Sequence, residues 1–179
     1  MNNKMNGVKI KRIVTISLIS ALAGVIGVID KTISMSMFPY VPGVKVGLAN
    51  VIILSMIYAS DIKYTLAVVF IKSFIVGFMI GGLTTFIISF TASVSSFIVM
   101  YIIRKIIKNY ISIITVSVMG GITHILVQLM VIRFIYHINN EIFYYRIILF
   151  IISVVTLILI GILANKITKN SFIMQKFNI

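Results

Sequence analysis

The sequence predicts an all-α integral membrane protein with six transmembrane helices. Hydrophobic residues make up 60% of the 179 positions, the mean hydropathy is +1.17, and only 11% of the residues are charged. Soluble domains are about 25% charged, and a small one leaves much of its surface in water. The composition therefore requires a bilayer as solvent. Because a spanning helix takes about 20 residues, six spans leave room only for short loops.

The apolar runs give the expected helices in chain order. The first, residues 13–29, follows a basic segment, and no small-residue cleavage site comes after it, so we interpret it as a retained helix. The second, residues 46–60, begins after a Pro-Tyr-Val-Pro-Gly breaker, and the short link to the third predicts a tight hairpin. The remaining expected spans cover residues 64–80, 83–103, 111–132 and 147–164.

The basic residues are distributed unevenly between these spans. The side that carries both termini has eleven Lys and Arg residues, whereas the opposite side has four: Lys31, Lys45, Arg133 and Arg146. Since basic residues accumulate in cytoplasmic segments, both termini are predicted to be cytoplasmic. The chain then divides into a cytoplasmic N-terminus (1–12), a six-helix membrane domain (13–164) and a cytoplasmic C-terminal tail (165–179).

The rare residue types restrict the chemistry. The chain has no cysteine, two histidines and three acidic residues, which excludes disulfides and thiolate catalysis and predicts no metal site and no cofactor. The net charge of +13 at pH 7 would suggest nucleic acid in a soluble protein. Here the basic residues lie mostly between apolar runs, so we attribute them to membrane orientation and expect no nucleic-acid partner.

Polar side chains within the apolar helices mark a candidate site, because such residues are costly in a bilayer. Lys72 lies in the middle of the expected third helix, from which its ammonium reaches an interface poorly. In the fifth helix Ser117, Gly121, His124 and Gln128 are spaced 4, 3 and 4 and share one face. We interpret Lys72, His124 and Gln128 as ligand-binding residues.

Small residues form stripes on two further helices. For the fourth helix we favour helix packing, the normal role of small and hydroxyl residues in membranes; its stripe comprises Thr85, Ser89, Ala92, Ser93 and Ser96. The first helix has three overlapping small-xxx-small pairs, which predict close approach by another helix of this chain or of a partner protein. These pairs are Ser17/Ala21, Ser20/Gly24 and Ala23/Gly27.

The cations and the polar face of the fifth helix are expected to converge in an outward-facing cavity. The residues concerned are Lys45, Lys72, His124, Gln128 and Arg133. No acidic residue falls inside an expected span, so this cavity is predicted to be positive and to prefer an anionic ligand such as a phosphate or carboxylate. The same absence argues against a proton- or sodium-coupled transporter that works alone.

One stretch of the chain resembles a known family. Residues 42–50, Pro-Gly-Val-Lys-Val-Gly-Leu-Ala-Asn, resemble the Pro-x-x-Lys-x-Gly-Leu-Ala-Asn signature of the Gx transporter family, also labelled heptaprenyl diphosphate synthase component I. The resemblance covers about residues 12–165 and also includes Lys72, Gly77, Ser89, Ser95, Ser96, residues 117–124, Gln128 and Leu129. The chain departs from the family at Lys72, Ala92 and Ile125, where Arg, Gly and Asn are usual.

The resemblance implies a fold and a function. It implies a six-helix substrate-binding (S) component of an energy-coupling-factor type ABC importer, in a bacterial plasma membrane. Such a component binds a small, here anionic, micronutrient or cofactor precursor, and works with a transmembrane coupling protein and two ABC ATPases. The substrate-binding residues would be Lys45, Asn50, Lys72, Ser89, His124, Gln128 and Arg133, and the partner-docking residues Ser17, Ala21 and Gly24.

The family's second label suggests an alternative, a subunit that supports polyprenyl diphosphate synthesis. Prenyl transfer needs Mg²⁺ held by clustered carboxylates, whereas Asp30, Asp61 and Glu141 are scattered at the ends of the expected helices. We therefore expect no catalytic residue and no enzymatic activity in this chain. An accessory role in that synthesis, or in flavin- or quinone-linked electron transfer, remains the alternative.

Reporter fusions test the predicted topology. A reporter after residue 179 should lie in the cytoplasm and one within residues 138–144 outside, because the basic residues orient the chain. The measurement is the activity of an enzyme that folds on one side only, such as alkaline phosphatase. Finding both reporters on the same side would contradict six spans.

Overall fold

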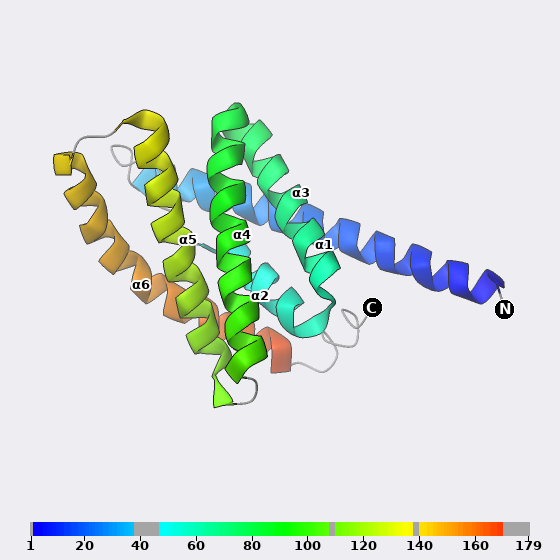
Figure 1. The fold of residues 1–179 in the computed structure, drawn as a ribbon. Helices are drawn as coiled ribbons and strands as arrows, with labels where there is room; N and C mark the ends of the chain where they lie inside the picture. The colour runs from blue at the N-terminus through cyan, green and yellow to red at the C-terminus, as the bar shows by residue number, and fades with distance from the viewer. Residues whose placement is uncertain (1, 38–46, 108–109, 138–139, 170–179) are drawn as a thin grey trace.

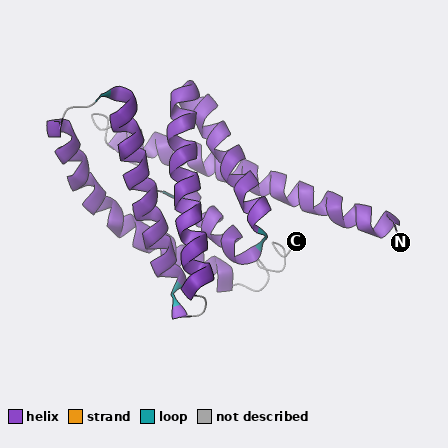
Figure 2. Ribbon diagram, viewed as in Figure 1, coloured by secondary structure: helices purple, strands orange, loops and turns teal. Residues whose placement is uncertain are grey.

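The computed structural model describes residues 2–37, 47–107, 110–137 and 140–169, which fold into helices joined by short connections (Figures 1 and 2). Side chains are described at residue 10 and over residues 12–36, 47–107, 110–137 and 155–169. No strand occurs among these residues. The helices are α1 (Asn2–Met37), α2 (Ala49–Ala59), α3 (Ile62–Ile80), α4 (Gly82–Ile107), α5 (Ile113–Tyr136) and α6 (Asn140–Lys169).

Four described helices are long and apolar enough to cross a membrane, and they contain the candidate spans Arg12–Ser36, Ile62–Ile80, Gly82–Ile107 and Ile113–Tyr136. The chain is therefore an all-helical membrane protein. Helix α6 has 30 residues. Helix α2 is apolar but has only 11 residues, about 16 Å at 1.5 Å per residue, so it is shorter than the expected second span and about half as long as the hydrocarbon layer is thick.

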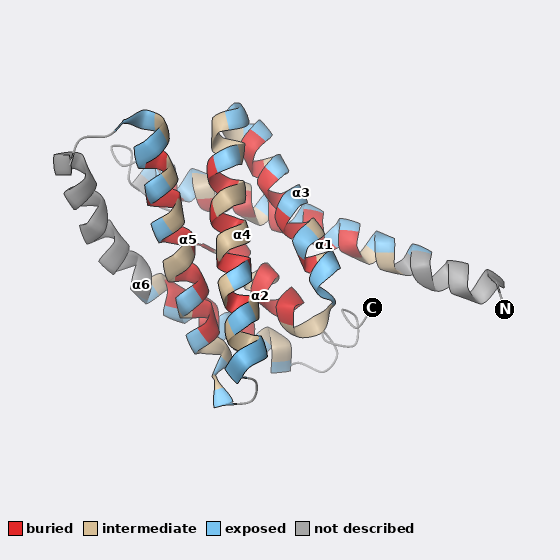
Figure 3. Ribbon diagram, in the orientation of Figure 1, coloured by how far each residue is buried: buried red, intermediate tan, exposed pale blue. Residues whose placement is uncertain are grey.

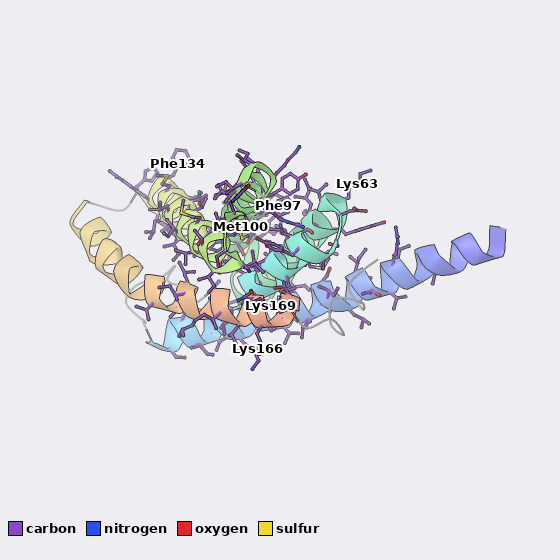
Figure 4. All side chains as sticks on the ribbon, turned by 90° about the horizontal axis from the view of Figure 1, so that it is seen from below. Lys63, Phe97, Met100, Phe134, Lys166 and Lys169 are labelled. Carbon is purple, nitrogen blue, oxygen red and sulfur yellow. The ribbon has the colours of Figure 1, made fainter. Side chains whose placement is uncertain are left out.

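Five helices form an arc around α2. The neighbours along this arc are α6 and α5, α5 and α4, α4 and α3, and α3 and α1, and each of the five also contacts α2. Seen from below, α1 and α6 form one layer and α3, α4 and α5 the other, while the N-terminal part of α1 projects beyond the bundle (Figure 4). The other described helices thus cover most of the surface of α2.

The interior of the arc is filled by apolar side chains from every layer. Seven of the 11 residues of α2 are buried, and Figure 3 shows the buried residues of the other helices on their inward sides. In the largest cluster, Leu54 and Ile57 of α2 pack with Phe97 and Met100 of α4 and Val116 of α5. Large apolar residues also cover the outward faces, as expected where lipid rather than water surrounds the bundle.

An apolar groove lies where the arc ends, between α1, α2 and α6. It has a volume of about 490 Å³ and is lined by aliphatic side chains such as Leu22 and Ile26 of α1, Val51 and Ile52 of α2, and Leu163 of α6. The hydroxyl-bearing residue Ser55 of α2 also borders it. The groove therefore separates the first and last helices of the chain along part of their length.

The small residues of α1 pack inside this chain. A Cβ at Gly24 would lie 2.6 Å from Cδ1 of Ile75, and one at Gly27 would lie 2.7 Å from Cγ2 of Val76, both on α3. Gly24 is therefore an internal packing residue, which corrects its assignment as a docking residue for a partner. Ser17 and Ala21 are exposed on α1, and their docking role stays a prediction.

Several helix limits differ from those expected. Helix α1 begins at Asn2, within the segment expected to precede the bundle, and it continues past Ile29 to Met37. In its polar end, hydroxyl groups donate to the carbonyls four residues earlier, as Ser34 does to Asp30 at 2.7 Å, so these groups are satisfied within the helix. Helix α2 begins late because Gly47 has φ of +88°, which lies outside the helical region. The tail expected from residue 165 is helical as far as Lys169.

Gly77 tests the close approach of α3 and α4. A Cβ at Gly77 would lie 2.6 Å from Cα of Phe86, so Gly77→Ala forces the backbone of α4 to move. We expect a loss of about 1–3 kcal/mol in stability, measured as a lower thermal unfolding midpoint in detergent. Gly24→Ala is the matched control, because its methyl group meets the movable end of the Ile75 side chain. Equal losses in the two variants would contradict this interpretation.

Candidate functional site

Lys72 lies at the centre of a buried polar cluster between α2, α3 and α4. Its side chain is 5% exposed, and its Nζ donates to Oδ1 of Asn50 at 3.3 Å and to Oγ of Ser93 at 3.5 Å. These partners hold the ammonium inside the bundle, where a charge is costly unless polar groups surround it. The geometry therefore favours the predicted site over a lysine that reaches outward to the membrane surface.

Asp30 of α1 holds the turn that precedes α2. The N–H of Gly47 donates to its carboxylate, with the nitrogen 3.1 and 3.0 Å from the two oxygens. Gly47 has φ of +88°, a conformation that favours glycine, and its carbonyl accepts from the N–H of Asn50 at 2.9 Å. The stretch Gly-Leu-Ala-Asn thus supplies a left-handed turn, a buried Ala49 and the amide that binds Lys72.

The two buried charges bind the same turn. Asp30 bonds to Gly47 and Lys72 bonds to Asn50, three residues further on. The position of a Cβ at Gly27, one turn before Asp30 on α1, is 3.7 Å from Cε of Lys72, so α1 also lies against the lysine side chain. A carboxylate of opposite charge therefore lies close to Lys72 in the fold.

This position of Asp30 corrects the expectation that no span contains an acidic residue. Asp30 is 2% exposed and lies within the candidate span Arg12–Ser36. It was expected at a helix end because the apolar run stops at Ile29. With both groups ionised, Asp30 balances the charge of Lys72, so the charge of the site does not by itself require an anionic ligand.

Polar residues of α4 and α5 lie at matching levels of two antiparallel helices, and Gly121 on the polar face of α5 packs against Leu157 of α6. Oγ of Ser96 donates to the carbonyl of Gly120 at 2.7 Å, which confirms the packing role expected for Ser96. At 1.5 Å per residue from this bond, Ser93 lies level with His124, and Ser89 with Gln128, to within about 1.5 Å. These four side chains are buried. The polar cluster therefore continues from Lys72 across α4 to α5.

Five of the seven predicted substrate-binding residues are buried in the bundle, and two of them, Lys72 and Asn50, are in direct contact. The five are Asn50, Lys72, Ser89, His124 and Gln128. Arg133 does not join them. It is exposed near the end of α5, where it borders a separate pocket of about 520 Å³ with Phe134 and His137, and Phe134 lies at the outer edge of the bundle in Figure 4. Lys45 lies outside the described residues.

The sequence interpretation missed two members of the cluster. Ser93 was assigned to packing alone, although its hydroxyl accepts from Lys72. Asp30 was treated as a helix end. The spacing of Gly27, Asp30 and Ser34 by 3 and 4 residues places them on one face of a continuous helix, and this pattern was the signal that could have identified Asp30.

Asp30→Ala tests the support that α1 gives to this turn. The variant removes the acceptor of a buried N–H, so we expect a loss of about 1–3 kcal/mol in stability, measured by thermal unfolding in detergent. Asp30→Asn, which keeps one acceptor oxygen, should lose less. Asp61→Ala is the control, because Asp61 is exposed before α3 and its side chain makes no capping bond there. Similar midpoints for Asp30→Ala and Asp61→Ala would argue against the role of Asp30.

Comparison with known proteins identifies a family. The chain matches the family described as heptaprenyl diphosphate synthase component I over residues 19–167, from within α1 to near the end of α6. No curated protein and no solved structure matches the chain. The matched segment contains the whole buried polar cluster, from Asp30 to Gln128. The chain therefore belongs to the heptaprenyl diphosphate synthase component I family, as the resemblance of residues 42–50 predicted.

Proposed function

We propose that this protein is the substrate-binding (S) component of an energy-coupling-factor type ABC importer. The observation that carries the proposal is the buried polar cluster, to which α1, α2, α3, α4 and α5 each contribute. Polar and charged residues are rare inside membrane bundles and usually mark the path or the site of a polar solute. The resemblance of residues 42–50 to the Gx transporter signature implies the same function by analogy.

The direction of the helices supports a chain that crosses the membrane repeatedly. Helices α1 and α3 advance in the same direction, because Gly24 lies against Ile75 and Lys31 further along α1 donates to Thr85 beyond the end of α3. The chain must therefore return across the bundle between them, through α2. We propose six spans with both termini cytoplasmic in a bacterial plasma membrane, with α6 as the last span.

The proposed importer needs further subunits. The sequence has no P-loop, so ATP would be hydrolysed by two ABC ATPases joined through a transmembrane coupling protein. The exposed Ser17 and Ala21 of α1 are suited to close approach by a helix of the coupling protein, since small residues let membrane helices pack tightly.

The ligand that we propose is a small polar micronutrient or cofactor precursor. An anionic group on it would bind best at the ammonium of Lys72, through a charge-assisted hydrogen bond. Because Asp30 carries the opposite charge beside the same turn, a zwitterionic or neutral ligand with an acceptor group also fits this site.

The alternative is an accessory subunit of polyprenyl diphosphate synthesis, or of flavin- or quinone-linked electron transfer. In either case we propose that this chain catalyses no reaction itself. A magnesium site for a diphosphate needs several carboxylates together. Asp30 instead binds the turn before α2, whereas Asp61 follows the other end of this helix, about 16 Å away.

Uptake into proteoliposomes tests the transport proposal. Native mass spectrometry of the purified protein identifies a co-purified small molecule, and this molecule is then offered to vesicles that contain the chain, the coupling protein and both ATPases. We expect accumulation that needs ATP and stops when the ATPases carry inactive P-loops. Binding without uptake would contradict the transport proposal. Enhanced prenyl transfer by a synthase that co-purifies with the chain would favour the alternative.

Lys72 provides the sharpest test of the site. Lys72→Met should lower the affinity for the molecule identified by mass spectrometry about 10-fold or more, since a hydrogen bond to a charged group contributes roughly 1.5–3 kcal/mol. Lys72→Arg keeps the charge and should retain most of the affinity. Calorimetry measures both variants, with Lys63→Met at the exposed start of α3 as the control. Unchanged affinity in Lys72→Met would show that Lys72 serves only the packing of the bundle.

A further inference from the structure

Two buried polar side chains on facing helices have no hydrogen-bond partner within the described part of the chain. They are the amide oxygen of Gln128, in a side chain 2% exposed, and the hydroxyl of Ser89, in a side chain 1% exposed. A buried polar atom without a partner costs about 1–3 kcal/mol, and such atoms in native proteins usually meet water or a ligand. Their position therefore indicates where a bound molecule would be held.

The two side chains lie at one level of the fold, on neighbouring helices that are both packed around α2. Ser89 precedes Ser96 by seven residues in α4, and Gln128 follows Gly120 by eight residues in α5. Because the two helices are antiparallel, both residues are displaced toward the same end of the bundle from the bond between Ser96 and Gly120. Both distances are about two helical turns, so the two side chains lie at the same level. Gln128 shares its face of α5 with Gly121, beside Leu157 of α6, and therefore points into the bundle next to α4. Ser93, which accepts from Lys72, lies one turn from Ser89 on the same face.

The chemistry of a primary amide restricts what it binds. Gln128 presents a carbonyl acceptor and an NH₂ donor side by side, whichever way the amide is turned. A neutral group that satisfies both at once is an N–H adjacent to a C=O on the same side, as in a lactam, an imide or a cyclic urea. Ser89 can donate or accept a further bond at the same level.

We propose that Gln128 and Ser89 recognise the N–H and C=O edge of a small cyclic amide, imide or ureide. The inference rests on the proposed function, because it names the class of ligand that this binding component would take. The edge binds between α4 and α5, and the remainder of the ligand extends past Ser93 toward Lys72. Gln128 thus selects the ligand class, and Lys72 holds an acceptor group at its other end.

Fragment binding tests this directly. The probes are succinimide, 2-pyrrolidinone and 2-imidazolidinone, each compared with its fully N-methylated counterpart, which cannot donate. Binding to the full-length protein in nanodiscs is measured by ligand-observed NMR titration. We expect at least one N–H probe to bind about 10-fold more tightly than its methylated counterpart, the value of one hydrogen bond of about 1.4 kcal/mol. A site built for a polar group strongly disfavours the analogue that lacks it.

Substitutions test whether Gln128 and Ser89 cause the preference for the unmethylated probes. Gln128→Leu should reduce it to near unity, Gln128→Asn should keep part of it, and Ser89→Ala should weaken it. Ser20→Ala is the matched control, because Ser20 is also buried and its hydroxyl has no partner within the described residues. It lies in α1 next to Ile19, which packs against α2 and α3 rather than between α4 and α5. Thermal unfolding in the same nanodiscs checks that each variant is folded.

The outcomes separate this inference from the transport proposal. Equal binding of methylated and unmethylated probes, or a preference that survives in Gln128→Leu, would overturn the inference. A failure of every probe to bind would also overturn it, and would leave water as the partner of the Gln128 amide and the Ser89 hydroxyl. A preference that depends on Gln128, combined with no uptake in proteoliposomes, would retain the inference and overturn transport. Uptake of a ligand without an N–H and C=O edge would retain the transport proposal and overturn the inference.

Discussion

The fold depends on one constraint, the solvation of a short apolar helix whose first turn is polar. Helix α2 alone is shorter than the hydrocarbon layer is thick, and it contacts each of the other five described helices. Its apolar residues need only be surrounded, but Gly47 and Asn50 at its start need polar partners, which lipid cannot provide. Asp30 of α1 and Lys72 of α3 reach this turn from the helices that pack beside it. The close approach of α1 and α3 at Gly24 and Gly27 is what allows both to reach it.

The same architecture separates packing from recognition along α4 and α5. From Gly120 toward Ile113 the helices meet through apolar contacts, where Val116 packs with Phe97 and Met100 and Ser96 is satisfied by a backbone carbonyl. In the other direction both helices carry buried polar residues, and within the described part of the chain the hydroxyl of Ser89 and the amide oxygen of Gln128 have no hydrogen-bond partner. A bundle needs the first kind of contact to be stable, whereas the second kind costs free energy unless something polar is bound. A site built at one end of a rigid interface gains a fixed geometry without weakening the interface as a whole.

Hydropathy predicted the helical class and most of the helices, and the spacing of polar residues predicted that Lys72, His124 and Gln128 share the interior. Hydropathy and spacing did not place Asp30, Ser93 and Arg133 correctly, and each error has a physical reason. The expected first helix stops before Asp30 because a hydropathy scale scores every carboxylate as hydrophilic. In the structure the N–H of Gly47 binds this carboxylate in place of water. The spacing of Ser93 is equally compatible with packing, and only the reach of a lysine from another helix assigns its hydroxyl to the site. Arg133 belongs to the same helix as Gln128 but is exposed beside Phe134 and His137, since five residues rotate a side chain well away from the starting face.

The groove between α1, α2 and α6 means that the described part of the chain leaves an apolar space in its own interior. Its aliphatic walls, such as Leu22, Val51 and Leu163, enclose about 490 Å³, and water gains little in such a space because it finds few polar groups there. Hydrocarbon chains from the surroundings are the natural filling in a bilayer or a micelle. The choice of amphiphile then becomes a thermodynamic variable, since chains of different length and branching fill the groove differently. Stability measured in one detergent is thus a property of the protein and that detergent together, and only values obtained in the same amphiphile can be compared between variants.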